Sequence, residues 1–282
     1  SRPATGVRLP GTYVDHVVVD EDMMMTTETP YEPAYFSGRR IDMAQLSAPP
    51  FSVDRIIANR VAVEVPTNQL AIYGFGAATD VPLVMAEQGR FDNGKIRDYP
   101  STTEHGAYGG IVMPGWQFSA NINPDALLDG VTQFDAIDGG LCPFAALSFA
   151  EFDAEGIVNV SRFGSACPGA GGFIDIAQNA QKIILAGTFT TGGLKADIRD
   201  GRLVILQEGR VRKFVSSVQS VTYRVREGVA RGQEAMIVTE RAVFQVAADG
   251  LELVEIAAGV DLEKDVLALM DFKPLRIADP LP

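Results

Sequence analysis

The chain has 282 residues, of which 46% are hydrophobic and 21% charged, a composition that supports a packed core and excludes wholesale disorder. Its length fits one large α/β domain with an extra segment, or two small domains. The formal net charge of −12 and the lack of a basic run exclude a typical nucleic-acid-binding surface, and no apolar stretch approaches the roughly 18 residues of a membrane span.

Residues 1–50 carry no clear core pattern, and only the stretch 13–19 predicts a strand. We interpret this region as an extended connector. The chain also starts with Ser1 instead of Met, which favours a processed or truncated product. Residues 52–65 then have apolar positions at helical spacing, and Ser52 is the expected N-cap.

A strand at 70–77 runs into glycines, and a helix follows at 80–89. Apolar stretches further along predict strands or strand pairs at 144–152, 158–160, 182–189, 235–240 and 242–256, with turns near Asp200-Gly201 and Asp249-Gly250. Residues 261–270 predict an amphipathic helix. The order strand, glycines, helix is typical of a parallel sheet covered by helices, so we expect an α/β fold with a mixed, mostly parallel sheet.

Four glycine loops are candidates for chemistry: IYGFGA (72–77), TTEHGAYGG (102–110), DGGL (138–141) and CPGAGGFIDI (167–176). Glycines let a backbone approach a ligand closely, and successive N–H groups can bind an oxyanion. Each loop alone is at least as often an ordinary turn, and the first lacks the GxGxxG spacing of a dinucleotide site. Three of the loops follow apparent strands, so together they predict one crevice at the carboxyl edge of the sheet.

Glu104 is the carboxylate within these loops, and it could act as a base or as a nucleophile. The local pattern alone fits a solvated turn more often than a catalytic residue. We expect His105 to point away from Glu104, because neighbours on an extended segment face opposite sides. The two cysteines, Cys142 and Cys167, are too few for a disulfide scaffold, which favours a reduced, cytoplasmic protein. The two histidines lie far apart in the sequence, so we expect no metal site.

These loops, in this order, resemble the glutamate-bearing half of the family I coenzyme A-transferases, and the single-chain acyl-CoA:acetate type most of all. The family's motif, Thr-x-Glu-x-Gly followed by a glycine pair, matches Thr102, Glu104, Gly106 and Gly109-Gly110 in place. Further similar blocks are QFDAIDGGL (133–141), EFDAEGIVNVSRFG (151–164), GAGGFIDIAQNAQKIILAGTFTTGGLK (169–195), TERAVF (239–244) and DLEKDVLALMDFKP (261–274).

The resemblance implies an open CoA-transferase sheet and a ping-pong exchange in which Glu104 attacks a short-chain acyl-CoA and becomes a glutamyl-CoA thioester. Coenzyme A is then a substrate, the acceptor is an acetate-like carboxylate, and no metal or other cofactor is required. The positions matching the family's oxyanion and CoA-binding loops are Gly74, Phe75, Gly76, Gly106, Gly139, Gly140, Gly171 and Gly172.

The resemblance divides the chain into a connector at 1–50, a catalytic half domain at 51–275 and a tail at 276–282. The family's other half is absent from this sequence, so the expected partner is a complementary N-terminal or alpha half, as a separate chain or a cleaved fragment, in a homo- or hetero-oligomer. Two departures affect the expected activity: Leu141-Cys142-Pro143 follows the Gly139-Gly140 pair, and the first loop reads Gly-Phe-Gly-Ala-Ala-Thr. Two alternatives therefore stay open, an acyl-CoA hydrolase on the same site and a non-catalytic CoA-binding relative.

Overall fold

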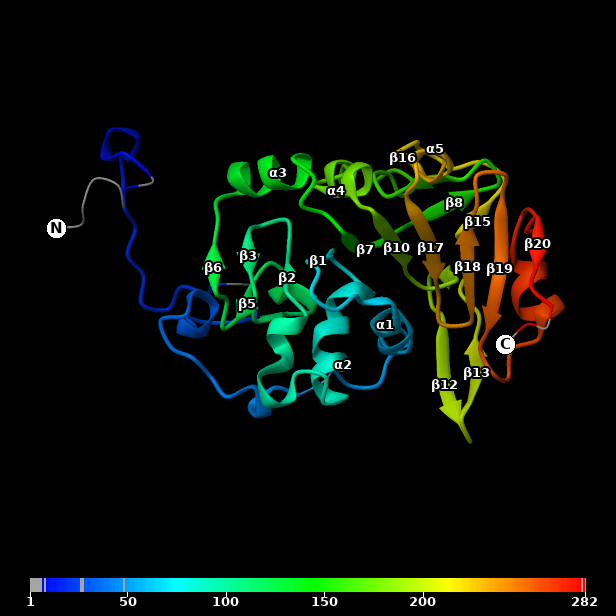
Figure 1. The fold of residues 1–282 in the computed structure, drawn as a ribbon, viewed down its shortest axis with the longest axis horizontal. Coiled ribbons are helices and arrows are strands. Elements are labelled where there is room, and N and C mark those ends of the chain that lie inside the picture. The colour runs from blue at the N-terminus through cyan, green and yellow to red at the C-terminus, as the bar shows by residue number, and fades with distance from the viewer. Residues whose placement is uncertain (1–6, 8, 26–27, 48, 280, 282) are drawn as a thin grey trace.

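The computed structural model describes residues 7, 9–25, 28–47, 49–279 and 281. Its centre is a ten-stranded sheet (Figure 1). In spatial order the strands are β20 (Arg276–Ile277), β19 (Leu251–Ile256), β18 (Ala242–Val246), β17 (Glu234–Val238), β10 (Lys182–Ala186), β7 (Phe144–Ser148), β1 (Ala71–Tyr73), β2 (Ser101–Thr102), β3 (Ala107–Tyr108) and β6 (Ala126–Leu127).

The middle of this sheet is parallel. Strands β17, β10, β7, β1 and β2 pair in parallel, while β18 and β19 on one side and β3 and β6 on the other are antiparallel additions. The central strands are buried along their length, as β10 shows with Ile183, Ile184, Leu185 and Ala186. Continuous aliphatic runs are what a parallel sheet covered on both faces requires. The sequence prediction of a mixed, mostly parallel α/β sheet is confirmed.

Helices cover both faces of the sheet (Figure 1). One face packs against α1 (Val53–Glu64) and α2 (Val81–Glu87), and the other against α3 (Gly130–Asp138), α4 (Phe173–Asn179) and α5 (Val225–Ala230). Alternate strand residues divide between the two cores: Ile183 and Leu185 face α4 and α5, whereas Ile184 and Ala186 face α1. This two-sided burial fixes the strand ends that carry the glycine loops.

Smaller elements surround the sheet. The strands outside it are β4 (Ile111–Val112), β5 (Asn121–Ile122), β8 (Glu151–Asp153), β9 (Ile157–Asn159), β11 (Thr190–Thr191), β12 (Lys195–Arg199), β13 (Arg202–Gln207), β14 (Val211–Arg212), β15 (Phe214–Val215) and β16 (Tyr223–Arg224). The short helical turns are η2 (Gly11–Tyr13), η3 (Pro33–Phe36), η4 (Met43–Gln45), η5 (Ala77–Asp80), η6 (Asp92–Asp98), η7 (Gly115–Gln117), η8 (Leu262–Val266) and η9 (Leu267–Leu269).

Most predicted elements are confirmed. Helix α1 begins after Ser52, whose side chain accepts the Arg55 N–H at 3.1 Å as an N-cap. The β12–β13 hairpin turns at Asp200-Gly201, where both residues have the positive φ that a tight hairpin needs. The strand pair β18–β19 turns at Asp249-Gly250.

Two element predictions are wrong. Residues 13–19 pair with no strand in the described part of the chain, and Val17, Val18 and Val19 are exposed because nothing covers them. Residues 261–270 form a π-helical turn, η8, followed by a 3₁₀ turn, η9, instead of one α-helix. The helical register breaks at Val266, whose φ of −121° and ψ of −71° lie outside the α region.

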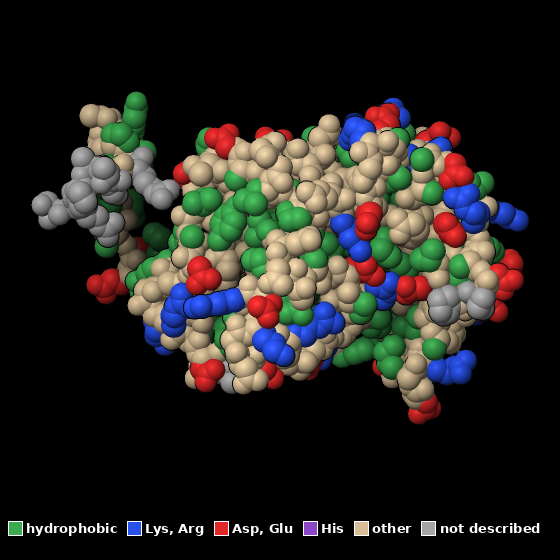
Figure 2. Space-filling view, in the orientation of Figure 1, with side chains coloured by type: hydrophobic (Ala, Val, Ile, Leu, Met, Phe, Trp, Pro, Cys, Tyr) green, Lys and Arg blue, Asp and Glu red, His purple; other side chains and the backbone are tan. Residues whose placement is uncertain are grey.

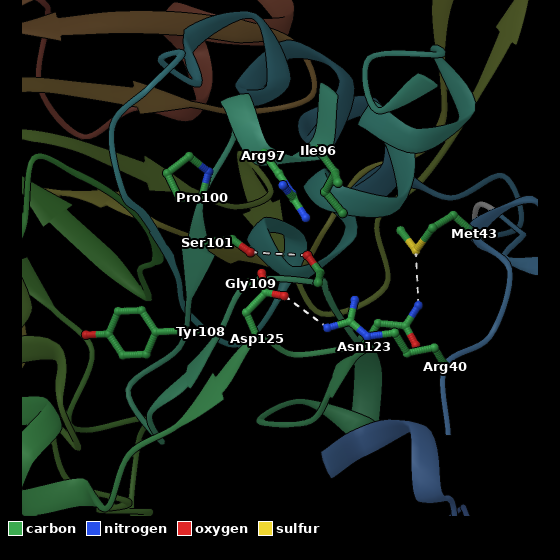
Figure 3. Close-up of a pocket in the computed structure, with 11 residues that line it drawn as sticks. Arg40, Met43, Ile96, Arg97, Pro100, Ser101, Tyr108, Gly109, Asn123 and Asp125 are labelled. Atoms are coloured by element: carbon green, nitrogen blue, oxygen red, sulfur yellow. Dashed lines mark hydrogen bonds and ion pairs between the residues drawn. The ribbon is translucent and has the colours of Figure 1, made fainter. Parts of the chain in front are cut away.

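Part of the region 1–50 packs onto the domain. Asn123 exchanges two hydrogen bonds with the backbone of Ile41, at 3.0 and 2.8 Å, and Ala34 and Tyr35 are buried against Ile122. A hollow of about 350 Å³ remains between Arg40 and Met43 on one side and strands β2 and β3 on the other (Figure 3). No helix among the described residues is long and apolar enough to cross a membrane.

Candidate active site

Glu104 lies in a tight turn between β2 and β3. The Gly106 N–H donates to the Thr103 carbonyl at 3.1 Å, and Gly106 has a φ of +85°. Thr102 and Thr103 are fully buried, and the Gln133 side chain donates to the Thr103 carbonyl at 2.9 Å. The turn is therefore held from beneath, while the Glu104 side chain keeps 29% of its surface exposed.

The loop before α4 contacts this carboxylate directly. The Gly172 N–H donates to Glu104 Oε2 at 3.1 Å. A Cβ at position 172 would lie only 2.4 Å from the same oxygen, so a glycine is required for this approach. Two of the glycine loops singled out in the sequence thus meet at one carboxylate.

A cleft of about 400 Å³ opens beside Glu104. The ends of β1 and β7 and the loop before α4 form its walls. The lining residues are Gly74, Phe75, Glu104, Leu147, Ser148, Phe149, Ala150, Val160, Phe163, Pro168, Gly169, Ala170, Gly171, Phe173 and Ile176. A crevice at the carboxyl edge of the sheet is therefore present, three of the four glycine loops predicted to form it contribute to its lining, and most of its wall is apolar.

The first glycine loop places a backbone against the β7 end. A Cβ on Gly74 would lie 2.8 Å from Leu147 Cδ2, and one on Gly76, at φ +109°, would lie 2.2 Å from Ser148 Oγ. The Ser148 hydroxyl donates to the Phe75 carbonyl at 2.6 Å. These contacts hold Phe75 at the cleft.

Two residues of the cleft lining have backbone N–H groups without a protein partner. Among the described residues, neither the Phe75 N–H nor the Gly171 N–H is donated to another protein group. Both residues line the cleft with Glu104. Free N–H groups fixed in a partly dry site are suited to stabilise a developing negative charge.

The remaining predicted glycines lie elsewhere. Gly139 and Gly140 end helix α3, where their N–H groups donate to Asp135 and Ile137 carbonyls at 2.9 Å, and neither lines the cleft. Gly106 shapes the Glu104 turn, and Gly76 lies just outside the cleft lining. The residues at the end of β7 were not singled out in the sequence, although a parallel neighbour of β1 must end at the same edge.

The expectation that His105 points away from Glu104 is wrong. His105 Nε2 lies 3.9 Å from Glu104 Oε1, and its Nδ1 hydrogen-bonds to the Ser119 hydroxyl at 2.7 Å. The reason is the turn closed by Gly106, which replaces the extended backbone that the expectation assumed.

Exposed aromatic rings lie next to this pair. The His105 ring lies 5.9 Å from that of Phe118, and Phe75 lies 5.8 Å from both Phe118 and Trp116. Phe75 and Trp116 are 52% and 67% exposed. Hydrophobic side chains also gather over β1–β3 on the face seen in Figure 2. An exposed aromatic group of this kind is typical of a surface that binds a ligand or a partner.

The hollow of Figure 3 is a separate feature from this cleft. Its lining includes Arg40, Arg97 and Asp125 but not Glu104, and the Tyr108 ring points away from the other labelled side chains. The Arg40 guanidinium is paired with Asp125 at 3.1 Å. Across the described residues, no group of three or more His, Cys, Asp or Glu could hold a metal ion.

Comparison with known proteins gives the family. No protein-family model matches the chain. The acetate CoA-transferase YdiF of Escherichia coli K12 is 41% identical over 270 residues, covering 95% of this chain, and the caffeate CoA-transferase of Acetobacterium woodii is 36% identical over 281 residues. The crystal structure of the acyl-CoA transferase YdiF of E. coli O157:H7, as a thioester complex with CoA, superposes with a TM-score of 0.80 at 38% identity over 99% of this chain and 52% of that one.

The chain belongs to the family I CoA-transferases.

The match covers one half of the single-chain family I enzymes. The chain spans 50% of the E. coli acetate CoA-transferase and 52% of the caffeate CoA-transferase. It aligns with 95% of the beta subunit of the Haemophilus influenzae acetate CoA-transferase, at 26% identity over 79% of this chain. The family resemblance and the CoA-transferase fold expected from the sequence are confirmed.

Proposed function

We propose that the chain is the catalytic half of a CoA-transferase that moves coenzyme A from a short-chain acyl-CoA to an acetate-like carboxylate, with Glu104 as the nucleophile. The observation that carries this proposal is the hydrogen bond from the Gly172 N–H to Glu104 Oε2 at the edge of the cleft. A carboxylate is a weak nucleophile in water and needs a fixed position against the thioester. The buried threonines and the glycine contact supply that position.

The exchange has two halves. A Glu104 oxygen attacks the thioester carbonyl carbon, the carbon–sulfur bond breaks, and the CoA thiolate leaves a mixed anhydride between the acyl group and Glu104. The thiolate then attacks the Glu104 carbonyl carbon and expels the acyl group as a carboxylate, which leaves a glutamyl-CoA thioester. An acceptor carboxylate reverses both steps, so no oxidant, reductant, metal or other cofactor takes part.

Each attack passes through an oxyanion. Phe75 and Gly171 line the cleft and have free N–H groups, and an oxyanion donor contributes about 2.7–4 kcal/mol. We assign the oxyanion role to these two and the positioning role to Gly172. Gly139 and Gly140 are left out because their N–H groups are already donated at the end of α3.

The acyl group is small or apolar in this proposal. Phe75, Leu147, Phe149, Phe163 and Phe173 form much of the cleft wall. The relatives named for acetate and for caffeate differ widely in acyl size. An apolar wall discriminates by only about 1–3 kcal/mol per methylene, so a related chain can serve several acids.

The proposal includes a second protein part. We infer that residues 51–275 are the catalytic half domain, that 1–50 connect it to a complementary N-terminal or alpha half, and that 276–282 form a tail. Support comes from the half-length match and from the exposed aromatic group beside Glu104. A second half covering that group would exclude water from the mixed anhydride.

The test compares Glu104→Gln and Glu104→Asp in the complete protein that carries this chain. Both variants should lose acyl-CoA:acetate exchange, the first entirely and the second nearly so, because a shorter side chain moves the nucleophile by more than about 1 Å. Turnover in Glu104→Gln above a few per cent of the wild type would refute the assignment. CoA release that does not depend on acetate would favour a hydrolase, and CoA binding without turnover in the wild type would favour a binding subunit.

A further inference from the structure

Lys213 is a buried amine that the proposed reaction does not use. It lies between β14 and β15 and is only 5% exposed. Its Nζ lies 3.8 Å from the centroid of the Phe149 ring and packs so closely on Gly187 that a Cβ there would come within 2.8 Å. The ammonium is thus placed above the carboxyl ends of β7 and β10.

Among the described residues, the Lys213 Nζ forms no hydrogen bond and no ion pair, and it lies over the face of the Phe149 ring. Burial lowers the pKa of Lys213 to about 7, while the charges of Glu240 and Asp54 act in the opposite direction. Both oxygens of the Glu240 carboxylate have other partners: Oε1 pairs with Arg241 at 2.6 Å, and Oε2 accepts the Phe189 N–H at 2.9 Å.

Lys213 lines a cavity of about 590 Å³. Arg162 lines the same cavity, is exposed, and its guanidinium has no carboxylate partner among the described residues. The one carboxylate in the lining, Glu151, accepts the Asn159 side chain and the Gln219 N–H at 2.8 and 2.7 Å. Lys213 and Arg162 therefore line this cavity without an ion pair to Glu151 or to any other carboxylate among the described residues.

The cavity adjoins the Glu104 cleft. Phe149, Ala150 and Phe163 line both spaces, so one ligand that extends past these residues can occupy both. A buried charge without a partner is costly, and an anion bound beside it would offset that cost. A buried amine of this kind is expected at a binding site, because residues placed for function often lower the stability of the fold.

We propose that Lys213, with Arg162, forms an anion subsite that binds an anionic group of the substrate whose reacting carbonyl lies at Glu104. The proposal rests on the proposed function for the position of that carbonyl. The shared chemistry is an anionic oxygen, supplied either by a phosphate of coenzyme A or by a second carboxylate on the acyl or acceptor acid. Lys213 acts as a binding and positioning residue and takes no part in bond making.

The test uses Lys213→Met, Lys213→Arg and Arg162→Met in the complete protein, with Lys195→Met as a matched control on the exposed β12 strand. Binding of CoA and pantetheine is measured by calorimetry, and exchange kinetics are measured with acetate and with succinate as acceptors. Because Lys213→Met loses a charged hydrogen bond, its affinity for the anionic probe should fall about tenfold to hundredfold. Lys213→Arg should keep most of the affinity, and Lys195→Met should match the wild type.

The two sources of the anion give different patterns. If a phosphate binds here, the loss appears for CoA and is absent for pantetheine. If a carboxylate binds here, the loss appears as a raised KM for succinate and is absent for acetate. Wild-type values within twofold for CoA and both acids in Lys213→Met would overturn the proposal. If that variant does not fold, unchanged values in the surface variant Arg162→Met would do the same.

Failure of the subsite and failure of the proposed function are separable. A normal Glu104 adduct with no effect of Lys213→Met removes the subsite and keeps the mechanism. A specific loss of affinity in Lys213→Met without any Glu104 adduct keeps the subsite and removes the mechanism.

Discussion

Replacement of Lys213 by methionine should stabilise the fold in a pH-dependent way. The methionine keeps much of the apolar stem against Phe149 and removes the buried amine. The Lys213 pKa falls from an ordinary 10.5 to about 7 on folding. At about 1.4 kcal/mol per pH unit, this difference corresponds to roughly 5 kcal/mol of destabilisation when the amine is charged.

The sign follows from proton binding. Below pH 7 the ammonium is charged in both states, and the full cost of burying it is present. Between pH 7 and 10.5 the unfolded chain binds more protons at Lys213 than the folded chain, so the wild-type free energy of unfolding rises with pH. The carboxylates that act on Lys213 are Glu240 and Asp54, and the variant also removes the Lys213 charge that opposes the burial-raised pKa of Asp54.

Urea unfolding of the wild type and Lys213→Met at pH 6 and pH 8.5 measures this. After about 1–2 kcal/mol is subtracted for the lost cation–π contact, the variant should be more stable by about 3 kcal/mol at pH 6. By pH 8.5 that advantage should shrink by about 2 kcal/mol. Lys195→Met should change stability by less than about 0.5 kcal/mol at either pH. A Lys213→Met variant no more stable than the wild type at pH 6 would show that the amine is not an unpaired buried charge.

Three further outcomes are expected. Gly172→Ala should lower kcat about a hundredfold with the fold intact, because the added Cβ would collide with Glu104 Oε2. The control Gly130→Ala, whose Cβ would meet nothing within 4 Å, should leave kcat unchanged. Equal kinetics for the two variants would contradict the contact between Gly172 and Glu104. Asn123→Leu removes both hydrogen bonds to Ile41, so it should lower the free energy of unfolding in urea by about 2–3 kcal/mol. It should also speed proteolysis near residue 41, and unchanged digestion would contradict this anchor. The purified chain should associate with a second chain over about 2,000 Å² or more, and a monomer with full exchange activity in light scattering would refute the missing half.

Hydrophobic runs and glycine loops were enough to predict the central architecture. Burial on both faces forces the residues of β10 after Lys182 to be aliphatic, so the run at 182–189 is visible without any alignment. Ser52 likewise marks the start of α1, because a helix leaves N–H groups that such a side chain must accept. The resemblance then pointed to Glu104, and the fold brings it against the predicted Gly172.

Features that depend on tertiary contact were not predictable. The strand expected at 13–19 fails because β-propensity alone cannot supply a partner strand. The turn that brings His105 to Glu104 depends on the positive φ of Gly106. The expectation of opposite directions assumed an extended backbone and left this turn out. Lys213 lies far in sequence from Phe149, and only the pairing of β15 with β8 brings the two together.

The central claim is that Glu104 carries coenzyme A covalently, and intact and peptide mass spectrometry after incubation with acyl-CoA tests it most directly. The wild-type protein should gain the mass of a CoA thioester, with the adduct on the peptide that contains Glu104, and borohydride should reduce that residue to an alcohol and abolish exchange. Glu104→Gln should gain nothing. Full exchange activity without any adduct on Glu104, or an adduct on another residue, would contradict the account.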